Sequence, residues 1–214
     1  VTMLGVFPLI SFFFEKKSVK QIVSSQWIFA AVTGVYFLLR INVLGDVNSL
    51  ESVSYIDNSL ILAEGTASKL ATALKVLLMY LGLLFLPYEL ICDRSYNHIV
   101  NVGLGDFWVW VALAVHVGLF VYALFGLKER RLMSFAILFY FITISLFSNI
   151  FIAIGSVMAE RFLYFSSFGF CLAGGLLFVK LDQRTQVSIG DNLKSFFQGH
   201  KKVLSIVGIV ALLY

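Results

Sequence analysis

The sequence predicts an all-α integral membrane protein, a polytopic bundle of helices. Sixty per cent of its 214 residues are hydrophobic, 13% are charged and the mean hydropathy is +0.93, so a soluble fold could not bury this much apolar surface. Two prolines, with no ten-residue alternating segments, favour helices over a membrane barrel. The net charge of +4 comes mostly from short loops between apolar runs, so it indicates membrane orientation and no nucleic-acid partner.

Seven apolar segments follow one another along the chain. Most of them are bounded by charged turns, and the third clear span carries Trp108 and Trp110 where interfacial aromatic residues usually lie. The first segment opens, and the last one stops, inside an apolar run, so we expect this sequence to be a fragment of a larger chain. We predict membrane spans at about 1–14, 22–39, 107–127, 132–154, 162–179 and 203–214, with a different role for 66–87.

The distribution of basic residues orients these spans. Three loops, at 15–20, 128–131 and 180–202, hold eleven of the 16 Lys and Arg residues, and basic loops stay in the cytoplasm. Three apolar segments lie between the first two of these loops, so one of the three cannot be a simple crossing.

Segment 66–87 is the expected exception. Lys69, Thr72 and Lys75 fall on one helical stripe, and the apolar remainder from Val76 to Leu86 is only about 16 Å long at 1.5 Å per residue. We predict an interfacial or re-entrant helix, which leaves residues 42–64 and 88–105 both external.

An acid and a base stand side by side between two apolar runs, at Glu160 and Arg161. An ionised side chain there is costly unless it is paired or hydrated. If residues 160–170 are helical, Tyr164 shares a face with the pair and Ser167 follows one turn later. We expect Arg161 to bind an anionic phosphate beside a buried Tyr164, because a guanidinium can grip phosphate with two hydrogen bonds.

The predicted external loop 88–105 adds further polar residues, chiefly Asp93 and Tyr96. With Glu160 they suit a ligand that has both a phosphate and hydroxyl groups, since carboxylates accept hydrogen bonds from sugar hydroxyls. Simpler interpretations stay open. Glu160 and Arg161 could be a salt bridge that locks two helices, and Asp93 could cap its loop or pair with the adjacent Arg94.

Other polar residues point to structural roles. Asp57 and Asn58 are typical of a turn, and His116 lies in mid-span as a hydrogen-bonded core residue. No cluster has metal-ligand spacing, and no glycine-rich nucleotide motif occurs, so we expect no metal or nucleotide cofactor.

Four stretches resemble one family in the same order along the chain. Residues 159–171, A-E-R-F-L-Y-F-S-S-F-G-F-C, resemble the A-E-R-x-L-Y-x-P-S-x-G-F-C signature of the transmembrane and tetratricopeptide-repeat O-mannosyltransferases, which are glycosyltransferases of the GT-C fold. Residues 89–95, E-L-I-C-D-R-S, are similar to its E-L-C-x-D-W-S loop. Asp57-Asn58 resembles its D-N-P, and V-T-M-L-G at 1–5 its I-T-V-L-G.

The departures from the family pattern are Ser166 and Ser59, where it has proline, and Arg94, where it has an aromatic residue. They indicate a divergent relative, and we expect a prokaryotic one. The resemblance implies an all-α, GT-C-like bundle in the bacterial inner membrane, or in the endoplasmic reticulum of a eukaryote.

The resemblance also implies an activity. It is the inverting transfer of a sugar, typically mannose, from a polyprenyl-phosphate carrier to Ser or Thr of an acceptor protein on the external face. Glu160, Arg161, Tyr164, Asp93 and Tyr96 are then the substrate-binding candidates. The catalytic carboxylate is expected upstream of Val1, and tetratricopeptide repeats after Tyr214.

Two other classes stay open. A transporter or flippase of lipid-linked glycans would need charges in mid-membrane or paired broken helices, and Lys75 is the one candidate charge. A non-catalytic membrane subunit would use its charged pairs only for packing.

Overall fold

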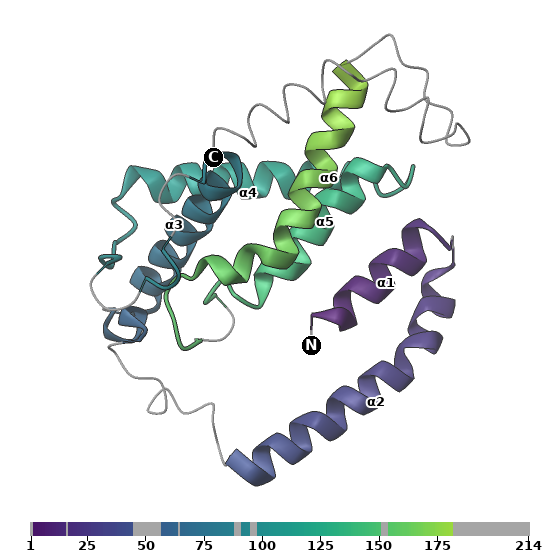
Figure 1. The fold of residues 1–214 in the computed structure, drawn as a ribbon, viewed down its shortest axis with the longest axis horizontal. Helices are drawn as coiled ribbons and strands as arrows, with labels where there is room; N and C mark the ends of the chain where they lie inside the picture. The colour runs from purple at the N-terminus through teal and green to yellow at the C-terminus, as the bar shows by residue number, and fades with distance from the viewer. Residues whose placement is uncertain are drawn as a thin grey trace. The chain divides into compact units, whose positions relative to one another are not determined.

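The computed structural model describes residues 2–15, 17–44, 57–63, 65–87, 91–94, 98–150 and 154–181. These residues form six α-helices and no β-strand, which confirms the all-α prediction (Figure 1). The predicted span 203–214 and most of the basic segment 180–202 lie outside the described residues. The helices are α1 Met3–Phe13, α2 Val19–Leu44, α3 Gly65–Phe85, α4 Phe107–Phe125, α5 Leu132–Ser145 and α6 Leu163–Leu181, with 3₁₀ turns η2 Ser59–Leu62 and η3 Glu160–Phe162.

Four of these helices, α2, α3, α4 and the η3–α6 segment, are long and apolar enough to cross a membrane. The other two, α1 and α5, are apolar but shorter. By length and composition, therefore, the chain is a membrane protein with transmembrane helices.

Two compact units divide the chain within α6, at residues 1–173 and 174–214. The second unit is described only through the last turns of α6, up to residue 181. All the candidate site residues that the structure describes belong to the first unit.

The α2 helix is longer than the predicted span 22–39 because both of its ends are stabilised locally. At its start, Ser18 N–H donates to Gln21 Oε1 at 3.0 Å, and Gln21 N–H donates to Ser18 Oγ at 3.4 Å. This reciprocal pair is a capping box, which fixes the first turn. Arg40, the predicted end, stays helical and donates to the Tyr36 hydroxyl one turn earlier at 3.3 Å.

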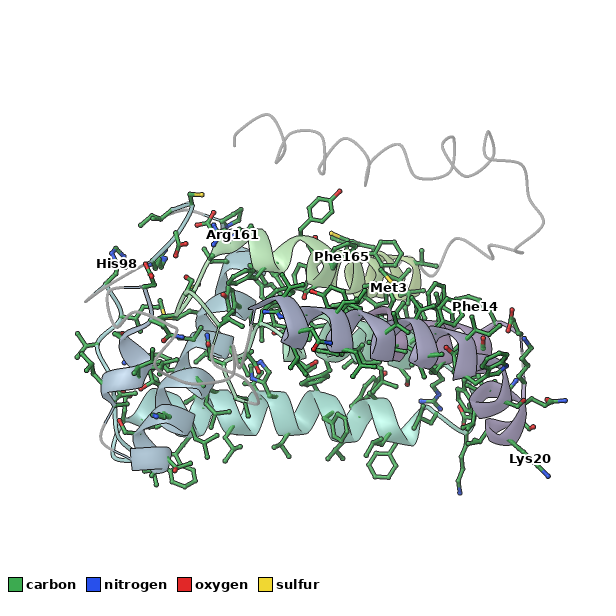
Figure 2. All side chains as sticks on the ribbon, turned by 90° about the horizontal axis from the view of Figure 1, so that it is seen from below. Met3, Phe14, Lys20, His98, Arg161 and Phe165 are labelled. Atoms are coloured by element: carbon green, nitrogen blue, oxygen red, sulfur yellow. The ribbon has the colours of Figure 1, made fainter. Side chains whose placement is uncertain are left out.

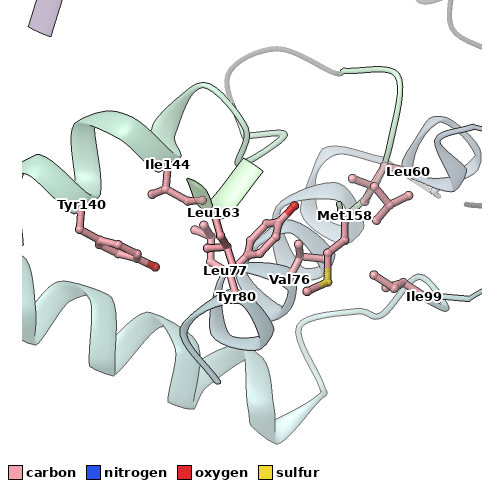
Figure 3. Packing of buried hydrophobic residues seen from close by; sticks show 10 residues of the cluster. Leu60, Val76, Leu77, Tyr80, Ile99, Tyr140, Ile144, Met158 and Leu163 are labelled. Carbon is pink, nitrogen blue, oxygen red and sulfur yellow. The ribbon is translucent and has the colours of Figure 1, made fainter. Parts of the chain in front are cut away.

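Two buried apolar clusters hold the first unit together. One joins α1 to α5 through Val6, Leu9, Phe13, Phe135 and Phe139. The other gathers side chains of α3 around the segment that leads into α6, and Figure 3 shows Leu77 and Tyr80 beside Met158 and Leu163. The second cluster therefore places α3 directly against the start of α6.

The predicted span 132–154 is wrong in its second half. The α5 helix ends at Ser145 after 14 residues, about 21 Å at 1.5 Å per residue, against a hydrocarbon core of about 30 Å. Asn149 then adopts the left-handed conformation, with φ +56°, which ends helices and which asparagine tolerates better than most residues. The described part of 146–159 is non-helical and carries buried residues, among them Ser148, Ser156 and Val157.

Two asparagine side chains form hydrogen bonds with backbone N–H and carbonyl groups of this irregular segment. Asn149 Nδ2 donates to the carbonyls of Ser156 and Val157, both at 3.1 Å, and its Oδ1 accepts from Ile154 N–H at 3.0 Å. Asn58, which is fully buried, donates to Asn149 Oδ1 at 3.1 Å and to the Ile154 carbonyl at 2.7 Å. Buried backbone groups need hydrogen-bond partners, and these amides supply them where the early end of α5 leaves the backbone without helical partners.

Candidate functional site

The structure brings the two charged stretches singled out in the sequence into direct contact. Arg161 Nη2 lies 3.0 Å from Asp93 Oδ2, across 68 positions of the chain. The Arg161 side chain is 56% exposed and the Asp93 side chain 35% exposed. Exposed ion pairs of this kind contribute only about 0–1 kcal/mol to stability. The contact therefore matters less for the stability of the fold than for bringing the two charged segments together.

Two further contacts join the same two segments. Glu160 Oε1 accepts a hydrogen bond from Ile91 N–H at 2.5 Å. The Arg94 N–H donates to the Met158 carbonyl at 2.9 Å, in an isolated antiparallel β-bridge. Residues 91–94 and 156–161 therefore form one polar cluster at the start of α6, which we call the Arg161 cluster.

Two hydroxyl groups hold the segments of the Arg161 cluster in place, those of Ser156 within the cluster and of Tyr80 on α3. Ser156 Oγ donates to Asp93 Oδ1 at 2.5 Å, which leaves Asp93 Oδ2 for Arg161. The fully buried Tyr80 of α3 binds the backbone of Ala159, accepting from its N–H at 3.0 Å and donating to its carbonyl at 3.4 Å.

Charges in the Arg161 cluster balance. Its described residues include two acids, Asp93 and Glu160, and two arginines, Arg94 and Arg161, and Arg94 Nη1 lies 3.3 Å from Nε2 of the exposed His98. Figure 2 shows Arg161 and His98 towards one end of the first unit and Phe14 and Lys20 towards the other. The cluster therefore lies towards the end of the first unit away from the basic 15–20 loop, and its external position stays a prediction.

Tyr164 differs from the prediction. Residues 160–162 form the 3₁₀ turn η3 and α6 begins only at Leu163. The Tyr164 side chain is 77% exposed rather than buried, and its ring packs edge-on against Phe165 at 5.5 Å. The Ser167 hydroxyl donates to the Tyr164 carbonyl within the same helix at 2.7 Å. The buried tyrosine beside the charged pair is Tyr80, from another helix.

Other predicted polar residues divide between structural roles and the undescribed part of the chain. Tyr96 and Glu89 lie outside the described residues. Asn58 is a buried structural residue, in keeping with the turn prediction. Its Nδ2 donates to the segment after α5, and its Oδ1 caps η2 by accepting from Leu60 N–H. His116 is confirmed as a hydrogen-bonded core residue, with Nδ1 2.8 Å from the Ala112 carbonyl and Nε2 3.4 Å from the Tyr140 hydroxyl.

Sequence reasoning missed Tyr80, Asn149 and Ser156. An asparagine that follows Ser145 and Ser148 at the end of an apolar run is a recognisable helix-stop pattern, so Asn149 could have been found. Tyr80 and Ser156 carry no such pattern, because a tyrosine inside an apolar helix and a serine in a loop are common.

A hollow of about 580 Å³ lies elsewhere, between the start of α3 and residues 101–104, and neither Arg161 nor Asp93 lines it. Among the described residues, no three His, Cys, Asp or Glu side chains gather closely enough to hold a metal ion.

These features define the class: an all-α membrane protein with a charged cluster where a membrane helix begins. No protein-family model, no curated protein and no solved structure matches the chain. The activity must accordingly be inferred from the site itself.

Proposed function

We propose that the chain is part of a multi-pass membrane glycosyltransferase that moves a sugar, expected to be mannose, from a polyprenyl-phosphate carrier to Ser or Thr of an acceptor protein on the external face. The Arg161–Asp93 contact carries this proposal. Two stretches that resemble one family's motifs, 68 positions apart, meet through these side chains, and the guanidinium stays more than half exposed.

The chemistry of the cluster suits a singly charged carrier. Arg161 uses one nitrogen on Asp93, and a guanidinium has five N–H donors in a planar fork, so donors are left for a phosphate oxygen. The cluster's two acids offset its two arginines. A near-neutral site of this kind favours a phosphodiester with its sugar hydroxyls over a more highly charged diphosphate.

The position of the cluster suits a lipid substrate. It lies at the start of α6, and in this proposal α6 crosses the membrane, which puts its first turn level with the lipid headgroups. The catalytic acid and the acceptor site belong to parts of the protein outside residues 1–214 in this proposal.

Replacement of Arg161 in the full-length protein tests the proposal. We expect Arg161→Ala to lower transfer from polyprenyl-phosphate mannose by roughly 10²-fold, because it removes a donor that holds the leaving phosphate. Arg161→Lys should retain an intermediate rate, since lysine keeps the charge without the fork. Lys128→Ala, an exposed change in the turn between α4 and α5, is the matched control and should leave transfer unchanged.

A different result would favour the non-catalytic subunit. Normal transfer by Arg161→Ala, together with equal losses of thermal stability for Arg161→Ala and Asp93→Ala, would mean that the ion pair only packs two segments. That outcome would contradict a carrier-binding role for Arg161.

A further inference from the structure

The backbone just before Arg161 is hydrogen-bonded to a side chain from another helix. Ala159, the residue before Glu160-Arg161, is extended, with φ −144° and ψ 137°, and is fully buried. The Tyr80 hydroxyl binds both of its backbone polar groups. A single phenol thus fixes the point from which η3 starts.

A second anchor acts on the partner of Arg161. The Ser156 hydroxyl donates to Asp93 Oδ1 and is within hydrogen-bond distance of the Met158 carbonyl, 3.2 Å away. Because Ser156 occupies one carboxylate oxygen, the other oxygen faces Arg161. The β-bridge between Arg94 and Met158 then fixes the spacing between the two segments.

We propose that Tyr80 and Ser156 are positioning residues, which together set the direction of the Arg161 guanidinium. Tyr80 does so through Ala159, and Ser156 through Asp93. Through Tyr80, α3 becomes part of the site although Tyr80 itself is fully buried. The consequence for sugar transfer rests on the proposed function, whereas the positioning itself does not.

Hydrogen exchange in the full-length protein tests the positioning without any substrate. Tyr80→Phe removes only the hydroxyl, and we expect amide exchange in the peptide containing residues 156–162 to become about tenfold faster, because the Ala159 N–H loses its acceptor. Tyr140→Phe is the matched control. Tyr140 belongs to the same buried cluster, but its hydroxyl contacts His116, so exchange at 156–162 should not change. Unchanged exchange in Tyr80→Phe would overturn the proposal.

Kinetics test the consequence for Arg161. We expect Tyr80→Phe and Ser156→Ala each to raise KM for the polyprenyl-phosphate sugar about tenfold with little change in KM for the acceptor protein. In an Arg161→Ala background neither change should have a further effect, since both act through that side chain. Additive losses would indicate a general structural role and overturn the positioning role.

The two experiments also separate this proposal from the proposed function. If the wild-type protein shows no transfer at all, the glycosyltransferase proposal fails, and the exchange result alone decides the positioning. If Tyr80→Phe fails to insert, Ser156→Ala carries the same test, with faster exchange expected in the peptide containing residues 91–94.

Discussion

Gly169 of α6 lies directly against the backbone of α5. A Cβ atom at this position would lie 2.6 Å from the Ala136 carbonyl oxygen and 3.0 Å from Tyr140 N. One turn earlier, the buried Ser166 hydroxyl accepts a hydrogen bond from Thr143 Oγ1 at 3.0 Å. Close approach and a polar contact together hold α5 against α6, the arrangement that small residues provide inside membranes.

We therefore expect Gly169→Ala to destabilise the full-length protein by about 1–3 kcal/mol, because backbone atoms cannot move aside as a flexible side chain can. Thermal unfolding in detergent measures this loss. Gly118→Ala on α4 is the control: a Cβ there meets nothing within 4 Å, so stability should stay the same or rise slightly. Equal unfolding temperatures for Gly169→Ala and Gly118→Ala would contradict the close approach.

Asp106 gives the fold a pH dependence. Its carboxylate pairs with Lys75 at 2.7 Å and caps α4 by accepting from Trp108 N–H at 2.9 Å. The hydrogen bond from Lys75, followed by that from the Trp108 N–H, lowers the pKa of Asp106 below its usual value. A lowered pKa in the folded state means that the stabilisation is complete above the unfolded pKa of about 3.9 and is lost as pH falls through the lower folded pKa.

Thermal unfolding between pH 7 and pH 3 measures this effect. Wild-type protein should lose stability in the acid range, and Asp106→Asn should lose less there because asparagine can still cap the helix but carries no charge. The variant should also be less stable than wild type at pH 7. The same acid loss in both proteins would mean that other carboxylates are responsible.

At the scale of elements, α3 is long and apolar enough to cross a membrane, and its contacts bear on the interfacial or re-entrant interpretation of 66–87, which stays a prediction. Near its start Ser68 Oγ donates to the Val102 carbonyl at 3.0 Å, in its middle Lys75 pairs with Asp106, and further on Tyr80 binds Ala159. Those partners directly precede α4 and η3. In the predicted topology α4 and α6 begin on the same side of the membrane. If α3 crossed the membrane, only one of its ends would then lie near the starts of α4 and α6.

Labelling with an impermeant maleimide tests this orientation. In full-length protein without Cys92 and Cys171, we expect single cysteines at Thr66→Cys and Leu86→Cys to be labelled from the same side of the membrane. Both positions are exposed and flank most of α3. Labelling from opposite sides would show that α3 crosses.

At the scale of the whole molecule, the first unit brings two of the predicted cytoplasmic loops together. The guanidinium carbon of Arg130 lies 4.9 Å from the centre of the Phe12 ring, and Phe13 and Phe14 pack edge-on against Phe135. The turn between α4 and α5 therefore lies beside the end of α1, and the Arg161 cluster lies towards the other end (Figure 2).

This arrangement predicts a labelling pattern. The native Cys92 is exposed and belongs to the Arg161 cluster, so it should react with an impermeant reagent from the external side. Lys17→Cys and Lys128→Cys, each in protein without native cysteines, should react only from the cytoplasmic side. Reaction of Cys92 and Lys128→Cys from one side would overturn the predicted topology and, with it, the external site.

Composition and hydrophobic runs determined the class of this protein and the places of most helices, because a helix that faces lipid must be apolar over its whole length. The charged pair at Glu160-Arg161 was also visible, since an ionised side chain between two apolar runs is costly unless it is paired or hydrated. Only the tertiary structure decided that α5 ends as early as Ser145, that Asp93 pairs with Arg161 and that Tyr80 supports the site. These features depend on contacts between residues far apart in the chain, and hydropathy and periodicity describe neighbours in sequence alone.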